Sequence, residues 1–184
     1  MKGILRMADQ DIYELASIFK SAMIAARDEG FFSIYNDFSH FPRGCCGETC
    51  YLLASFLREH GIDTLYVWGD YRTQSHAWLV VNDNRVKLPQ RKSPQFDSQY
   101  YELISRYGGC ISEETAHYTA RDLTQGLIVD ITADQFGEPS VFVGMRNDFY
   151  RKFKFRDAHI CNGVSDSRLK NIYNRISSFL PKFK

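Results

Sequence analysis

The stretch FPRGCCGETCYLLASFLREHGI, from Phe41 to Ile62, places three cysteines directly ahead of an apolar run. The run predicts a helix from about residue 46 to residue 60 that stops at Gly61. Three cysteines at the start of a helix could bind a metal ion, form a disulfide or supply a nucleophile. The rest of the sequence has to decide between these uses.

The segments on either side of this helix predict a single α+β domain over residues 1–184. Asp9 or Asp11 is expected to cap a first helix that ends near Asp28, and residues 30–44 are expected to form an ordered loop. After the cysteine helix, strands are expected at residues 64–71, 76–81, 126–132 and 140–144. A turn is expected at residues 82–84, followed by the strand-like run RVKL, and residues 166–180 are expected to form a terminal amphipathic helix. We interpret residues from about 84 to 125 as an insertion, with short helices starting near Pro94 and Ser112.

Composition and cysteine count argue against a disulfide. The chain has 184 residues, of which 44% are hydrophobic and 24% charged, as in an ordinary folded domain. The N-terminus lacks an apolar signal-peptide core, and no apolar run is long enough to span a membrane. Five cysteines are an odd number in a chain without a secretion signal, so we expect reduced thiols and a cytoplasmic location. Because no apolar run is long enough, we expect no membrane contact.

The net charge of +1 is unevenly distributed. Residues 1–145 carry 13 basic and 19 acidic side chains, whereas the C-terminal segment 146–184 carries 10 basic and 3 acidic ones. Within this basic segment, FYRKFKF alternates aromatic and basic residues and could face an acidic partner or nucleic acid. No nucleic-acid motif accompanies it, so we favour a solvated strand and helix whose apolar side packs on the core.

The spacing of the cysteines does not favour a metal site. Structural zinc sites usually pair their ligands as CxxC with a second pair further on. Here Cys45 and Cys46 are adjacent, Cys50 follows, and His40 is the histidine that could join them. On a helix, Cys46 and Cys50 share a face and Cys45 does not. We therefore expect no metal and no cofactor.

A nucleophile fits the position better. Unpaired N–H groups and the macrodipole at a helix N-terminus favour a thiolate, and the same groups can stabilise an oxyanion. Gly44 and Gly47 would let a substrate approach the start of the helix.

A nucleophilic cysteine also needs a base and a group to orient that base. His76, at the start of an apolar strand, is expected at a sheet edge facing the helix, and Asp130 is a carboxylate in a hydrophobic strand that needs a partner. Alternatively, each of these two residues has a purely structural role.

Taken in order, the motifs RGCC, LREHGI, YVWG, HAW and VDIT resemble the transglutaminase-like branch of the papain-like cysteine enzymes. In that family the nucleophile lies fifteen residues before the glycine that ends the helix, and counting back from Gly61 gives Cys46. The resemblance implies a helix packed on an antiparallel sheet and a triad of Cys46 as nucleophile, His76 as base and Asp130 as orienting acid. It also implies that Cys50 is buried and inert.

Two features depart from the family pattern. The family commonly has a hairpin between its histidine and its aspartate, whereas 53 residues separate His76 from Asp130. Gly47 stands where the family often has an aromatic residue after the nucleophile. The sequence motifs do not identify a side chain that would donate a hydrogen bond to an oxyanion.

The expected function is a cysteine-dependent enzyme acting on an acyl or amide carbonyl, with a protein or peptide as substrate. Hydrolysis, by a protease or deamidase, is favoured because the chain shows no obvious second-substrate site. The alternatives are a transglutaminase or other acyltransferase, an inactive binding module with a basic tail, and a zinc module. RGCCGE also loosely resembles arylamine N-acetyltransferases, in which a glutamate follows the nucleophile as Glu48 follows Cys46.

Overall fold

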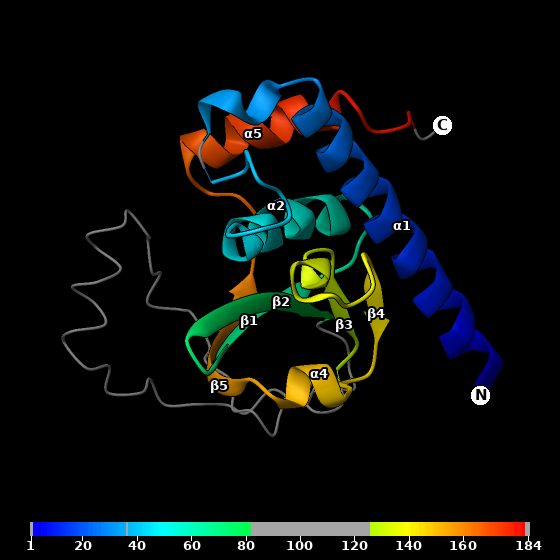
Figure 1. The fold of residues 1–184 in the computed structure, drawn as a ribbon. Coiled ribbons are helices and arrows are strands. Elements are labelled where there is room, and N and C mark those ends of the chain that lie inside the picture. The colour runs from blue at the N-terminus through cyan, green and yellow to red at the C-terminus, as the bar shows by residue number, and fades with distance from the viewer. Residues whose placement is uncertain (1, 36, 82–125, 183–184) are drawn as a thin grey trace.

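The computed structural model describes residues 2–35, 37–81 and 126–182. Four predictions lie outside these residues: the turn at residues 82–84, the RVKL strand, the helices near residues 94 and 112, and the insertion that would contain these helices. In chain order the elements are α1 (Lys2–Asp28), η1 (Phe31–Ile34), α2 (Cys46–Glu59), β1 (Thr64–Tyr71), β2 (Gln74–Val81), β3 (Ile128–Asp130), η2 (Ala133–Phe136), β4 (Phe142–Gly144), α4 (Asp148–Arg151), β5 (Lys154–Cys161) and α5 (Ser167–Ser177) (Figure 1).

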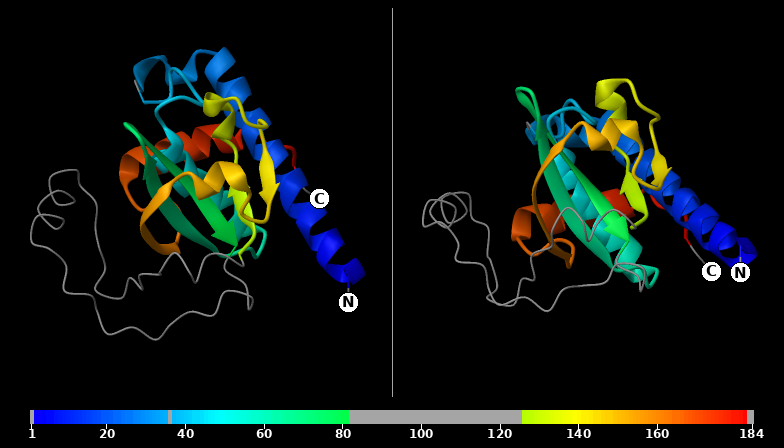
Figure 2. Two further views of the ribbon diagram at one scale, coloured as in Figure 1. Left: turned by 60° about the horizontal axis from the view of Figure 1, so that its bottom comes forward. Right: turned by 90° about the horizontal axis from the view of Figure 1, so that it is seen from below.

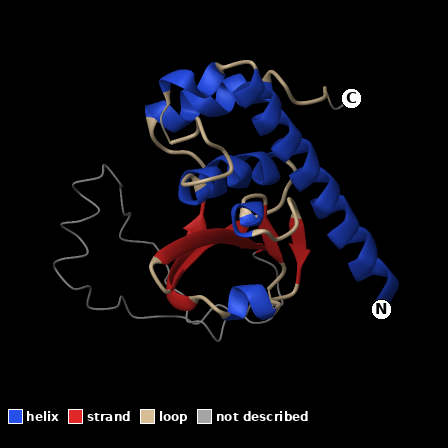
Figure 3. Cartoon of the chain, viewed as in Figure 1, coloured by secondary structure: helices blue, strands red, loops and turns tan. Residues whose placement is uncertain are grey.

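Five antiparallel strands form one sheet in the order β4-β3-β2-β1-β5, so the described residues have an α+β fold (Figure 3). Strand β1 matches its predicted run, β2 begins two residues earlier than predicted, and β3 and β4 are shorter than predicted. The prediction that His76 lies at a sheet edge is wrong, because β2 is the central strand. His76 instead pairs with Gly69 of β1, close to the turn that joins β1 and β2. Two further residue pairs lie between this pair and the turn.

Helix α2 packs on one face of the sheet and lies between the sheet and α5 (Figures 1 and 2). It begins at Cys46 and ends at Glu59, and Gly61 follows with a φ of 76°, a left-handed conformation that suits glycine. One side of the helix is buried through Thr49, Cys50, Leu52, Leu53, Ala54, Phe56 and Leu57. These boundaries agree with the sequence prediction.

The first helix is longer than predicted. It begins at Lys2, so the prediction that Asp9 or Asp11 caps its start is wrong, because both residues lie within it. The segment predicted as a loop after it contains the short helix η1. At the other end of the chain, Asp166 caps α5 by accepting a hydrogen bond from the Leu169 N–H at 2.9 Å.

Strand β2 contributes to two hydrophobic cores because its side chains alternate between the faces of the sheet. Ala77, Leu79 and Val81 pack with α1, α2 and α5. Trp78 and Val80 pack on the opposite face, in a core that also contains aromatic residues of α4 and of the residues just after it. Trp78 is thus a core residue.

The apolar side chains of the basic C-terminal segment pack on the core, as the sequence analysis favoured. In FYRKFKF, Phe149, Tyr150 and Phe153 are buried, whereas the basic side chains between them are exposed.

Gly69 of β1 explains how closely β5 approaches, since a Cβ at this position would lie 2.7 Å from the Lys154 carbonyl oxygen. In the described part of the chain, no helix is both long and apolar enough to cross a membrane.

Candidate active site

Cys46 is the first residue of α2, and the helix start leaves backbone donors available around it. The first helical hydrogen bond runs from the Thr49 N–H to the Cys45 carbonyl at 2.9 Å. The N-cap residue Cys45 makes no side-chain capping bond. The N–H groups of Cys46, Gly47 and Glu48 therefore have no acceptor within the helix.

Cys46 is also the one partly exposed thiol among the described cysteines. Cys45 is buried and its sulfur accepts a hydrogen bond from the Thr49 hydroxyl at 3.6 Å. Burial raises the pKa of Cys45 to about 11 and that of Cys161 to about 12, and it also raises the pKa of Cys50 well above its usual value. Cys50 is buried, as expected. Of the described cysteines, Cys46 is the least buried.

His76 and Asp130, which are 54 residues apart in sequence, form a buried pair. The distance from His76 Nε2 to Asp130 Oδ2 is 2.6 Å, and the two residues are 1% and 2% exposed. Because the bond occupies Nε2, the other ring nitrogen, Nδ1, is the one left for a further partner. Among the described residues Nδ1 has no partner with full hydrogen-bond geometry.

The thiol of Cys46 lies next to the His76 imidazole. Burial would lower the pKa of His76, but the charge and hydrogen bond of Asp130, together with a weaker contribution from the nearby Cys46 side chain, raise it to about 9. The effect of Cys46 on His76 requires that the two side chains be neighbours. Nucleophile–base contacts are often loose until a substrate binds, which agrees with the incomplete geometry at Nδ1.

Asp130 is held by donors on both of its oxygens. Oδ1 accepts hydrogen bonds from the Thr132 N–H at 2.8 Å and from the Thr132 hydroxyl at 3.0 Å. Oδ2 accepts from Tyr150 at 3.0 Å as well as from His76. Burial alone would raise the pKa of Asp130, but the charge and hydrogen bond of His76 and the two bonds from Thr132 hold it below its usual range. The carboxylate therefore stays ionised although it is buried.

Aromatic rings pack around the imidazole. The ring centroids of Phe136, Phe153, Trp78 and Phe149 lie 5.0, 5.6, 5.8 and 6.0 Å from that of His76. Such rings exclude water and strengthen the electrostatic interaction between His76 and Asp130.

Three residues near the site were not found from the sequence. Tyr150 is separated from Asp130 by twenty positions, and no local pattern predicts the contact. Thr132 could have been found, since a threonine two residues after a buried aspartate can donate to it locally. Tyr66 points its hydroxyl at the first turn of α2, 3.2 Å from where a Cβ on Gly47 would lie. Tyr66 thus occupies the space that a side chain at position 47 would need.

Glu48, which the N-acetyltransferase alternative singled out, forms an ion pair with Arg168 at the start of α5. Arg168 also pairs with Asp37 at 3.3 Å. These contacts join the first turn of α2 to α5 and to the loop before the helix, so Glu48 has a structural partner.

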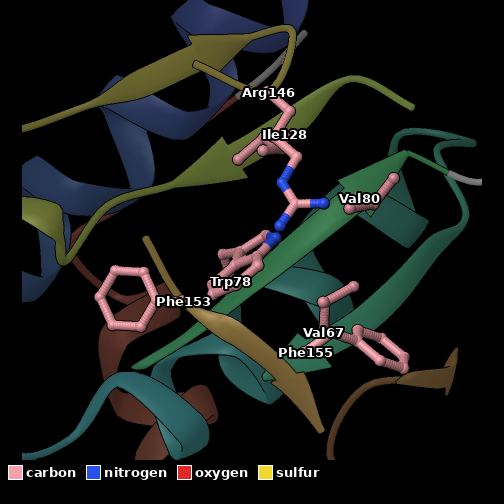
Figure 4. A pocket seen from close by; sticks show the side chains of 7 residues that line it. All are labelled: Val67, Trp78, Val80, Ile128, Arg146, Phe153 and Phe155. Atoms are coloured by element: carbon pink, nitrogen blue, oxygen red, sulfur yellow. The ribbon is translucent and has the colours of Figure 1, made fainter. Parts of the chain in front are cut away.

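The described residues offer no alternative metal site. Within the described ranges, no three His, Cys, Asp or Glu residues are grouped so that they could hold a metal ion. Figure 4 shows a pocket in the core that contains Trp78, on the face of the sheet opposite α2. The Arg146 guanidinium lies there near Ile128 and Trp78. The pocket has room for about one water molecule, so it is no candidate for a substrate site.

Comparison of the chain with protein-family models, with curated proteins and with solved structures found no match.

Proposed function

We propose that the protein is a cysteine-dependent enzyme that cleaves an acyl or amide bond with Cys46, His76 and Asp130 as a catalytic triad. One observation carries the proposal. The buried hydrogen bond between His76 Nε2 and Asp130 leaves Nδ1 for the neighbouring Cys46, the first residue of a helix whose first N–H groups have no acceptor within the helix. Nucleophile, base and orienting acid are thus arranged in series.

In the first half of the reaction, the Cys46 thiolate attacks the substrate carbonyl carbon and forms a C–S bond. The carbonyl oxygen becomes an oxyanion, which the free N–H groups at the start of α2 stabilise. Collapse of the tetrahedral intermediate breaks the C–N bond, and the imidazolium of His76 donates a proton to the leaving amine.

In the second half, water attacks the thioester and transfers a proton to His76. A C–O bond forms, the C–S bond breaks, and the carboxylic acid product leaves the thiolate and imidazolium as they were. We propose water as the acceptor and a protein or peptide amide as the substrate. We also propose that the domain belongs to the transglutaminase-like branch of the papain-like enzymes, which is supported by the order of its motifs and by α2 on an antiparallel sheet.

The proposal is tested by the reactivity of the individual thiols. Iodoacetamide is applied over a range of pH and its products are located by mass spectrometry, in the wild type and in His76→Ala. Cys46 is expected to react first, and His76→Ala is expected to slow it by about tenfold or more, because the paired imidazolium is lost. His60→Ala is the matched control, since His60 caps the other end of α2, where its Nδ1 lies 2.9 Å from the Phe56 carbonyl.

A second measurement addresses the acyl-enzyme. p-Nitrophenyl acetate should release a burst of nitrophenol and leave an acetyl group on Cys46, and Cys46→Ala should show no burst. Adding a dansylated alkylamine shows whether water or an amine accepts the acetyl group. If all thiols react alike, or if the burst survives Cys46→Ala, the triad is not catalytic.

A further inference from the structure

We infer that Tyr150, in the basic C-terminal segment, is a positioning residue that fixes the Asp130 carboxylate and limits how strongly it holds the proton on His76. The inference rests on the proposed function for its catalytic meaning, but its main test does not require activity. The Tyr150 hydroxyl lies 3.0 Å from Asp130 Oδ2, the same oxygen that accepts from His76.

The hydrogen bonds around Asp130 leave no free acceptor site. A carboxylate offers about four lone-pair positions, and two of the donors come from Thr132, one from His76 and one from Tyr150. With both donors of Thr132 on Oδ1, Tyr150 and His76 share Oδ2. If Tyr150 were missing, the carboxylate could rotate between arrangements and one buried lone pair would be unpaired.

Tyr150 is itself firmly held, as a positioning residue must be. Its ring, 1% exposed, packs against Phe149, Phe142 and Trp78 at centroid distances of 4.9, 5.0 and 5.3 Å. Its backbone N–H donates to Asn147 Oδ1 at 3.3 Å, which caps α4. The surrounding structure therefore determines where the hydroxyl points.

Tyr150 can act only as a donor to this carboxylate. Burial, followed by the negative charge of Asp130, raises the pKa of Tyr150 far above its usual value, so the hydroxyl keeps its proton. A hydrogen bond to Oδ2 withdraws charge from the oxygen that faces the imidazolium. Removing this bond should make the carboxylate more basic and raise the pKa of His76 further.

Among the described residues, the other ionisable groups that act on the pair or on Tyr150 include two cysteines, Glu138 and Arg146, whose guanidinium donates to the Tyr150 carbonyl at 3.3 Å. Cys46 faces His76 from α2. Cys50, also from α2, interacts with Asp130, and Glu138, before β4, interacts with Tyr150. Cys50 has a strongly raised pKa and stays neutral near pH 7, and none of these groups is altered by the change proposed below.

The test is Tyr150→Phe, which removes the hydroxyl and keeps the ring. Titration of His76 is followed by NMR of carbon-labelled histidine, with the resonance assigned through His76→Gln. The pKa of His76 is expected to rise by roughly half a unit to one unit. Acylation of Cys46 by p-nitrophenyl acetate is expected to slow by roughly fivefold to tenfold, as for one lost hydrogen bond. Tyr173→Phe is the matched control, because Tyr173 is a buried tyrosine in the core on the other face of the sheet.

A double-mutant comparison tests whether Tyr150 acts through Asp130. In an Asp130→Asn background, Tyr150→Phe is expected to leave the pKa of His76 and the acylation rate unchanged within error. An unchanged His76 pKa in Tyr150→Phe, or equal effects in both backgrounds, would overturn the inference. If Cys46 is unreactive in the wild type but the titration shifts as expected, the positioning role stands and the proposed function fails.

Discussion

Stability of the folded protein should depend on pH through the His76–Asp130 pair, and this dependence can be measured without a substrate. The pKa of His76 is raised from 6.5 to about 9 in the folded protein. The stabilisation it provides is therefore complete below pH 6.5 and is lost as the pH rises through 9. At about 1.4 kcal/mol per pKa unit, the full contribution to the free energy of unfolding is about 3 kcal/mol.

The perturbation is the double variant His76→Gln/Asp130→Asn, which keeps the shape of both side chains and removes both charges. Cys46→Ser is added to the variant and to its parent; it removes one of the groups that raise the pKa of His76, so the expected effect is smaller than the full contribution. Urea unfolding is then measured between about pH 5.5 and about pH 8.5. Over this window the parent should lose about 2 kcal/mol of stability relative to the double variant.

The window separates this effect from other titrations. The pKa of Asp130 is lowered below 3.8, so its own contribution is lost only in more acidic solution. The buried thiols of Cys45 and Cys161 have raised pKa values, so they destabilise the fold only above the ordinary thiol pKa of 9.0. If the parent and the double variant differed in free energy of unfolding by the same amount at every pH in the window, the charged pair would be refuted. If the advantage of the parent grew with pH, the raised pKa of His76 would be refuted.

Two further changes test contacts around the site. Gly47→Ala is expected to destabilise the fold by about 1 kcal/mol, because the new Cβ would lie 3.2 Å from Tyr66 Oη. In Tyr66→Phe the same change should become neutral or stabilising, since alanine favours a helix over glycine by about 1 kcal/mol; equal effects in both backgrounds would contradict the proposed contact. Lys20→Met should lower stability by about 2–3 kcal/mol in urea unfolding, because the buried ammonium of Lys20 binds Asp134 Oδ2 at 2.6 Å. A variant as stable as the wild type would show that this ion pair contributes little.

The local structure of the chain could be predicted well from sequence. The limits of α2, of β1 and β2, and of the terminal helix depend on apolar periodicity and on end signals such as Gly61 and Asp166, which act within a few residues. The same local reasoning failed for α1, where acidic residues that resemble caps lie inside a longer helix. Capping residues are also tolerated inside helices, so they mark a boundary only when the chain before them is not helical.

For the candidate site, the sequence supplied Cys46, His76 and Asp130, but the arrangement of their atoms depended on tertiary structure. The sequence did not determine that Asp130 binds Nε2 and leaves Nδ1 to Cys46, nor that β2 is the central strand. It also gave no sign that Tyr150, in a segment singled out only for its charge, donates to the same carboxylate. Residue types and helical spacing are properties of short segments, whereas a hydrogen bond between residues 54 positions apart exists only once the sheet has brought them within 3 Å.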